Sequence, residues 1–253
     1  MKRWHEPSRN SSSPAVVASP TTVDTTTSTI EADADATTST VEADANAIAD
    51  VDQVVSDSRD QSSSSKPWIP DLNLTSSDKD DIVSGRLLND RVVDASLTLI
   101  RRDTGVANQS TLLSQTAFLP AEANQDTVQI LHDKDHWVTV ASSSSGIVYA
   151  DSLKRNISGH LSKQIKEIFP EKLDNYNKIC VKLISCQLQT NCSDCGVFAI
   201  ANAIEFSQGR SPDMCSYDVP QMRKHLVNIF ESKELCSFPK TCVRPAASRV
   251  VKI

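Results

Sequence analysis

Apolar residues recur at helical spacing in five segments of the chain after residue 66. They predict helices at 77–84, 91–102, 158–169 and 197–206, and a fifth helix that begins at Asp218 and buries Met222, Leu226 and Ile229. Several of these segments carry boundary signals. Asn89 or Asp90 can cap the second helix, Pro170 follows the third, and Gly209 follows the fourth.

Alternating apolar and polar residues predict strands at 127–131, 136–141, 146–150 and 178–186. The second and third of these form a hairpin. A four-residue loop would pair Ala141 with Gly146, and would set His136 directly opposite Asp151 on the same face. A slip of one residue would move these two side chains to opposite faces. The mixture predicts an α+β fold, with a central, mainly antiparallel sheet flanked by helices.

The composition changes near residue 66. Residues 1–66 are rich in Ser, Thr, Ala and Asp, and they contain an imperfect repeat at 26–36 and 37–47. We expect a disordered, low-complexity acidic tail there. This tail holds 5 Lys/Arg and 11 Asp/Glu, whereas residues 67–253 hold 21 of each, so the charge of the folded part makes no case for or against a nucleic-acid partner, and none is indicated. We expect a catalytic domain at 67–235 and a basic C-terminal tail at 236–253.

The chain lacks the apolar segments that a signal peptide or a membrane span would need, so no membrane partner is expected. Its seven cysteines are an odd number. In a protein of a reducing compartment they are expected to be free thiols. These features predict an intracellular protein of the nucleus or the cytoplasm.

Cys195 is placed for nucleophilic chemistry. Asp194 can cap the helix that follows, so Cys195 falls in its first turn, where the positive end of the helix dipole favours a thiolate. Gln189 lies upstream in the predicted loop, and its amide can donate to an oxyanion. Gly196 leaves room for a substrate backbone.

The predicted hairpin supplies the partners that a nucleophilic cysteine needs. His136 can take and return a proton, and Asp151 can hold the imidazole in the required tautomer. We therefore expect a triad of Cys195, His136 and Asp151 with Gln189 in the oxyanion hole. An acyl-enzyme thioester would form and water would hydrolyse it.

The motifs Gln-x-x-x-x-Asp-Cys-Gly-Val-Phe at 189–198, His-Trp-Val at 136–138 and Asp-Ser-Leu at 151–153 resemble those of the ubiquitin-like-protein-specific cysteine proteases. These are sentrin/SUMO-type enzymes related to the adenovirus-type proteases. The resemblance covers about residues 68–235. It implies a papain-like or adenain-like fold, the same triad and oxyanion roles, and no cofactor or metal.

The resemblance also implies a substrate and its binding residues. The partner would be a ubiquitin-like modifier of the SUMO or NEDD8 class, with its conjugates, cleaved after its C-terminal glycine as a precursor or an isopeptide. Trp137 would be one wall of a tunnel for a Gly-Gly tail. Leu87 stands where the family has a tryptophan as the other wall, and Asp90 holds a position that contacts the modifier.

Other interpretations remain open. The same chemistry suits a polyprotein-processing protease of a mobile element or virus, and a non-catalytic modifier-binding module would keep the fold. The pair Cys192 and Cys195 has the spacing of a redox dithiol and can also form a reversible disulfide that silences the nucleophile. His132 and His136 have helical zinc spacing, but their segment reads as strand, so His132 is interpreted as a surface loop residue.

Overall fold

The computed structural model describes residues 66–253, so the predicted acidic tail and its repeat lie outside the described residues. The helices are α1 (Ser76–Val83), α2 (Asp90–Thr104), α3 (Gly159–Ile168), α4 (Cys195–Ser207) and α5 (Val219–Ser232). The strands are β1 (Pro67–Ile69), β2 (Leu74–Thr75), β3 (Thr127–Asp133), β4 (His136–Ser143), β5 (Gly146–Ala150), β6 (Cys180–Leu183), β7 (Cys215–Tyr217), β8 (Lys240–Cys242) and β9 (Arg249–Lys252). Short 3-10 turns occupy Pro70–Leu72, Thr111–Gln115, Pro170–Lys172 and Pro212–Met214. No helix within residues 66–253 has both the length and the apolar character of a membrane span.

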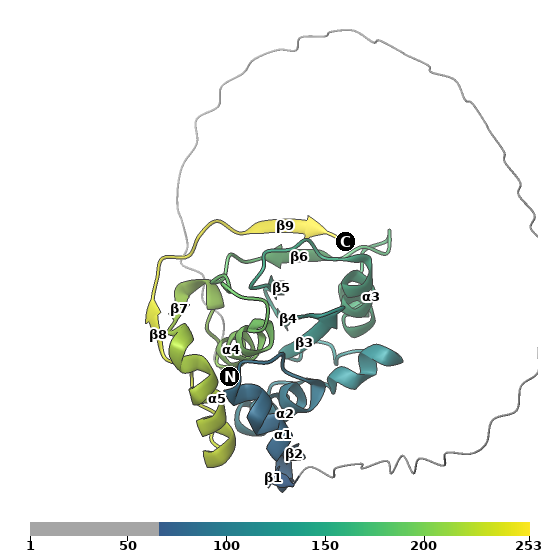
Figure 1. Cartoon of the computed structure of the whole chain (residues 1–253). Coiled ribbons are helices and arrows are strands. Elements are labelled where there is room, and N and C mark those ends of the chain that lie inside the picture. The colour runs from purple at the N-terminus through teal and green to yellow at the C-terminus, as the bar shows by residue number, and fades with distance from the viewer. Residues whose placement is uncertain (1–65) are drawn as a thin grey trace, which may run out of the picture. The chain divides into compact units, whose positions relative to one another are not determined.

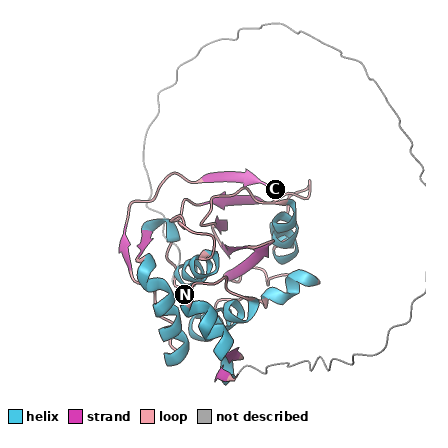
Figure 2. Ribbon diagram, in the orientation of Figure 1, coloured by secondary structure: helices cyan, strands magenta, loops and turns pink. Residues whose placement is uncertain are grey.

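A five-stranded sheet in the order β3-β4-β5-β6-β9 forms the centre of the described chain (Figure 1). Its neighbouring strands are antiparallel except for β5 and β6, which run parallel. Helices lie on both sides of the sheet, with α4 and α3 on opposite faces (Figure 2). The predicted α+β class, with a mainly antiparallel sheet between helices, is confirmed.

The alternation of side chains along each strand divides the apolar core into two layers. On one face, Val128, Ile130, Trp137, Ala141 and Ala150 pack with the residues of α2, α4 and α5. On the other face, Leu131, Val138, Val140, Ile147 and Tyr149 pack with Leu161, Ile165 and Ile168 of α3. The Thr139 hydroxyl also donates to the backbone carbonyl of Ala199 over 2.8 Å, which fixes α4 on the sheet.

The helix boundaries follow the predicted signals closely. Asn89 caps α2 by accepting a hydrogen bond from the Val92 N–H at 3.1 Å, and Gly105 ends that helix at a φ of 72°. Gly209 follows α4, also at a φ of 72°. Asp194 holds the N-cap position of α4 as predicted, but its carboxylate makes no capping bond there and binds other side chains instead.

The register of the β4–β5 hairpin differs from the prediction. Ser143 pairs with Gly146, so the loop has two residues, Ser144 and Ser145, and Val140 lies opposite Tyr149. Relative to the predicted pairing the strands have slid by two positions. A slide of two preserves the face of every side chain, because the side-chain period of a strand is two. His136 and Asp151 therefore remain on one face as diagonal neighbours rather than a direct pair.

The C-terminal segment is more ordered than a tail. β8 pairs with β7 in a separate two-stranded ladder, and β9 adds an edge strand to the central sheet beside β6. Ile253 extends this pairing, since its N–H and carbonyl both bond to the backbone of Ile179 at 3.0 and 3.1 Å. Residues 236–253 thus pack on the same body as residues 67–235.

Candidate active site

Three separate elements bring the predicted triad together. His136 is the first residue of β4, Asp151 directly follows β5, and Cys195 is the first residue of α4. The His136 Nε2 atom lies 2.6 Å from an Asp151 carboxylate oxygen, and both side chains are buried. The other ring nitrogen, Nδ1, is the one left to hydrogen-bond the Cys195 thiol.

The charges of this group favour a thiolate–imidazolium pair. Burial opposes ionisation of Cys195, but hydrogen bonds from His136 and from the backbone N–H groups of Trp137 and Gly196 outweigh it and lower the pKa of the thiol. Burial likewise opposes the imidazolium of His136, yet its bonds with Asp151 and Cys195 raise the pKa of this histidine from 6.5 to about 9. The sulfur is nucleophilic in this state.

The carboxylate of Asp151 is fixed by the backbone that follows it. One oxygen accepts from His136 and from the Leu153 N–H at 2.8 Å, and the other accepts from the Arg155 N–H at 2.8 Å. Three donors thus converge on one buried carboxylate. This arrangement holds the imidazole ring in one orientation with Nδ1 toward the sulfur.

Gln189 lies in the loop before α4, as predicted. Its amide nitrogen donates to the Asn191 carbonyl at 2.6 Å, and its amide oxygen accepts from the Ser152 hydroxyl at 2.6 Å. The amide nitrogen has a second N–H, for which no acceptor is found among residues 66–253. That N–H is available to a developing oxyanion.

Sequence reasoning did not identify the residue that fixes the loop before the nucleophile. The Arg223 guanidinium, on α5, donates to an Asp194 carboxylate oxygen at 2.8 Å and to the Ser193 carbonyl at 2.9 Å. Asn191 ties the same loop by accepting from the Asp194 N–H at 2.9 Å and donating to its carboxylate at 2.7 Å. No local signal in the sequence indicated this pairing, because Arg223 lies 29 residues after Asp194 and on a different helix.

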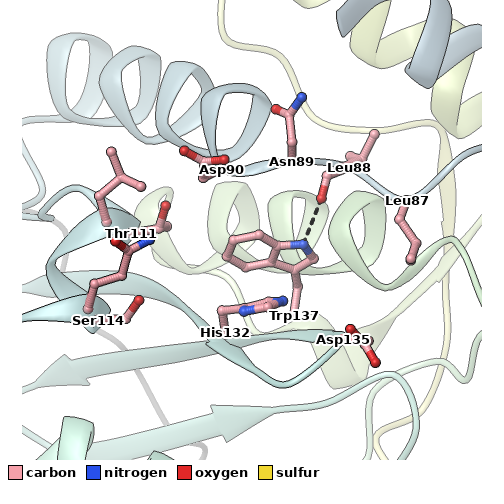
Figure 3. Close-up of a pocket in the computed structure, with 11 residues that line it drawn as sticks. Leu87, Leu88, Asn89, Asp90, Thr111, Ser114, His132, Asp135 and Trp137 are labelled. Atoms are coloured by element: carbon pink, nitrogen blue, oxygen red, sulfur yellow. Dashed lines mark hydrogen bonds between the residues drawn. The ribbon is translucent and has the colours of Figure 1, made fainter. Parts of the chain in front are cut away.

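A pocket of about 350 Å³ lies beside the triad and contains the predicted substrate-binding residues Leu87, Asp90 and Trp137 (Figure 3). Trp137 is buried, and its indole N–H donates to the Leu88 carbonyl at 2.9 Å. Leu87 is 48% exposed. Asp135 and Trp137, the two sequence neighbours of His136, line this pocket, whereas Cys195 and Gln189 do not.

Gly196 has a packing role that the sequence did not indicate. A Cβ atom built on Gly196 would lie 2.9 Å from the Leu88 Cβ, closer than such atoms come in proteins. The missing side chain therefore makes room for Leu88 against α4. The approach of a substrate backbone to Gly196 stays a prediction.

The interpretation of His132 as a surface loop residue is wrong. His132 belongs to β3, is half-buried, and its ring lies 4.4 Å from the Trp137 ring, centroid to centroid, at a tilt of 46°. Burial lowers the pKa of this histidine against the opposing charges of Asp135 and Asp133. A neutral imidazole therefore lines the pocket beside Trp137 (Figure 3).

No protein-family model and no curated protein matches this chain. Solved structures do match it. The SUMO protease Ulp1 with its catalytic cysteine oxidised to a sulfenic acid gives a TM-score of 0.51 at 18% identity, over 63% of this chain and 84% of that one. Its sulfinic-acid form gives 0.52 at 17% identity, over 66% and 87%. The described part of this chain therefore has the fold of the SUMO protease Ulp1.

Proposed function

We propose that this protein is a thiol protease that cleaves after the C-terminal glycine of a ubiquitin-like modifier of the SUMO class. The observation that carries the proposal is the contact of 2.6 Å between His136 and Asp151 next to Cys195 at the start of a buried helix. A binding module has no need of a cysteine whose pKa is lowered beside a histidine whose pKa is raised.

The reaction follows from the roles of these side chains. The Cys195 thiolate attacks the carbonyl carbon of the terminal glycine, and the negative charge moves to the carbonyl oxygen. The free N–H of Gln189 and a backbone N–H near Cys195 stabilise that oxyanion. As the tetrahedral intermediate collapses, the imidazolium of His136 gives its proton to the leaving amine, and a thioester remains on Cys195.

Hydrolysis of the thioester uses the same groups in reverse. Neutral His136 accepts a proton from water, and the resulting hydroxide attacks the thioester carbonyl. The thiolate leaves, and the modifier departs with a free C-terminal carboxylate. Asp151 orients the imidazole during both halves and stabilises its charged form.

The residues that line the pocket are consistent with a narrow, flexible peptide tail as the substrate. Trp137 is held rigidly by Leu88, whereas Leu87 at the rim is exposed. A glycine-rich tail has no side chains to clash with the buried indole. Asp90 at the start of α2 places a carboxylate at the same pocket, where it would bind a basic group on the body of the modifier.

The test uses modifiers of the SUMO, NEDD8 and ubiquitin types that carry an electrophile at the C-terminus. Reduced protein is incubated with each probe, and intact mass is measured. We expect one covalent adduct with the SUMO probe, none in Cys195→Ala, and an undiminished adduct in Cys192→Ala. The second variant is a matched control, because Cys192 is an exposed thiol in the same loop.

Each outcome has a defined meaning. An adduct with the NEDD8 probe alone would keep the chemistry and change the modifier. An adduct that survives in Cys195→Ala would overturn the nucleophile assignment. If folded protein reacts with none of the probes, cleavage of a modifier tail is refuted, and a polyprotein substrate or a binding role takes its place.

A further inference from the structure

The amide of Gln189 is held at both of its polar ends. Its nitrogen donates to the Asn191 carbonyl, and its oxygen lies 2.6 Å from the Ser152 hydroxyl. A backbone carbonyl only accepts hydrogen bonds, so the amide nitrogen faces Asn191 and the amide oxygen faces Ser152. The hydroxyl of Ser152 is therefore the donor in its bond with Gln189.

Ser152 also holds the main chain of Gln189. The Gln189 N–H donates to the Ser152 carbonyl at 3.0 Å. Both residues are buried, so these bonds are shielded from competition with water. Ser152 directly follows Asp151, and it thus joins the strand end that orients His136 to the loop that carries the oxyanion donor.

The hydroxyl of Ser152 has two effects on the amide of Gln189. It prevents rotation about the last side-chain bond, which would turn the amide oxygen toward the oxyanion. It also draws electron density toward the amide oxygen, which makes the free N–H a stronger donor. Donors that are fixed before the reaction stabilise a developing charge most effectively.

We propose that Ser152 is a positioning residue that presents the Gln189 amide to the oxyanion. This inference rests on the proposed protease function. Ser152 does not touch the substrate, so its contribution passes entirely through Gln189.

The first test is a double-mutant cycle with a fluorogenic modifier substrate. We expect Gln189→Ala to lower kcat about 100-fold. We expect Ser152→Ala to lower kcat about tenfold with KM unchanged within about twofold, and the double variant to be no slower than Gln189→Ala, because each change removes the same interaction. Ser152→Thr keeps the hydroxyl and should restore most of the loss.

A matched control separates this role from the loss of any buried hydroxyl. Ser96 is also buried, and its hydroxyl donates to the Val92 carbonyl on α2, away from the site. Ser96→Ala should leave kcat unchanged. Additive effects in the cycle, or a Ser152→Ala variant that changes KM alone, would overturn the inference.

A second readout needs no substrate. In wild-type protein the two protons of the Gln189 side-chain amide should give two signals at distinct chemical shifts, and in Ser152→Ala both signals should move, because the amide loses the donor to its oxygen and can turn about its last side-chain bond. Alkylation of Cys195 by iodoacetamide should be unchanged, since it develops no oxyanion. Failure of every modifier substrate would refute the proposed function, while unchanged amide signals in Ser152→Ala would refute the role of Ser152.

The β7–β8 ladder contains two cysteines, one on each strand. Cys215 lies directly opposite Cys242. In the same register, Met214 lies opposite Val243 and Asp218 lies opposite Pro239. Both of these pairs are hydrogen-bonded, because the Val243 N–H donates to the Met214 carbonyl at 3.0 Å and the Asp218 N–H donates to the Pro239 carbonyl at 2.8 Å. These bonds alternate along an antiparallel ladder, so Cys215 and Cys242 form a non-hydrogen-bonded pair.

This position suits a disulfide. In non-hydrogen-bonded pairs the Cα atoms are about 4.5 Å apart, within the range of about 4.4–6.8 Å that disulfides span. Both thiols are free, with Cys242 exposed and Cys215 buried beside a Glu205 carboxylate oxygen at 3.7 Å. The geometry points to a cross-strand disulfide between Cys215 and Cys242 that forms when peroxide is present.

The steps balance with peroxide as the oxidant. The exposed Cys242 thiolate attacks peroxide, one water leaves, and a sulfenic acid forms. Cys215 then attacks that sulfur, the disulfide forms, and a second water leaves. The bond would tie the segment after α5 to β7, whose Tyr217 packs on Phe198 of α4 at 6.0 Å between ring centroids.

Peptide mapping without reduction tests this assignment. Peroxide-treated protein should contain a peptide that links Cys215 to Cys242 with the loss of two hydrogen atoms, and its Tm should rise by several degrees. Cys242→Ser should abolish the link, and adding Thr241→Cys to that variant should not restore it, because residue 241 faces the other side of the ladder opposite Ser216. Oxidation that links other cysteines instead would overturn the assignment.

Discussion

Replacement of Asp151 by asparagine removes the charge that orients His136 and leaves the shape of the site. The carboxylate accepts from His136 Nε2 and from the N–H groups of Leu153 and Arg155. An asparagine amide has only one oxygen, so in either orientation its own N–H faces a donor. At least one donor to this buried group then loses its acceptor, which costs about 1–3 kcal/mol.

The electrostatic loss can be bounded from His136. Burial opposes the imidazolium, yet its pKa is raised from 6.5 to about 9, which corresponds to about 3 kcal/mol of net stabilisation of the charged form, at about 1.4 kcal/mol per pKa unit. The Asp151 bond is the largest cause that raises this pKa. We therefore expect Asp151→Asn to lower kcat/KM by about 10³-fold or more, in the range of other triad enzymes.

The dependence of the rate on pH should change in a defined direction in Asp151→Asn. The rate should rise with pH as Cys195 ionises and fall as His136 loses its proton near pH 9. Loss of the carboxylate lowers the pKa of His136, so the descending limb should move toward pH 6.5, and the variant should lose more activity at high pH than at low pH. Initial rates on a fluorogenic modifier substrate from pH 5 to 10 test this expectation.

A nearby carboxylate provides the control for this experiment. Asp133 pairs with His136 across the β3–β4 hairpin, but no hydrogen bond joins the two side chains among the described contacts. Asp133→Asn should leave both limbs of the profile in place. A descending limb that stays near pH 9 in Asp151→Asn, or a loss of rate under about tenfold, would refute the assigned role of Asp151.

Three further predictions concern the loop and the pocket. Gly196→Ala should destabilise the fold by about 1–3 kcal/mol in urea denaturation, because its Cβ would meet Leu88 at 2.9 Å; a more stable variant would contradict this packing. Arg223→Met should destabilise the fold by about 2–4 kcal/mol and lower kcat, since it leaves the Asp194 carboxylate without its cation; unchanged denaturation midpoints would show that the pair is dispensable. Leu87→Trp should lower KM for a modifier substrate roughly fivefold by adding apolar area at the pocket rim, whereas Val83→Trp, outside the pocket, should not.

The hairpin shows what the sequence could and could not predict. The alternation of apolar residues correctly put His136 and Asp151 on one face, because that depends only on a period of two. The loop length depends on the turn geometry of Ser144 and Ser145, which four consecutive serines do not specify. The contact was therefore predicted while the register was wrong.

Hydrogen-bond partners that are distant in sequence could not be predicted, for a different reason. Arg223 and Ser152 act through residues that are distant in sequence, and nothing in their local segments indicates Asp194 or Gln189 as partners. The strands β8 and β9 were also missed. Both are short; β9 pairs along the edge that β6 provides, and β8 pairs only with β7, a strand of three residues that the sequence also did not indicate.

Leu88 contacts the neighbours of both His136 and Cys195, so it couples the positions of these two residues. Its carbonyl secures the indole of the residue after His136, and its side chain fills the space over the residue after Cys195. A compound that displaces residues 87–90 from the rest of the domain would therefore loosen the positions of His136 and Cys195 together. Such a compound would inactivate the proposed protease from the substrate pocket, without an electrophile and without reacting with the thiol.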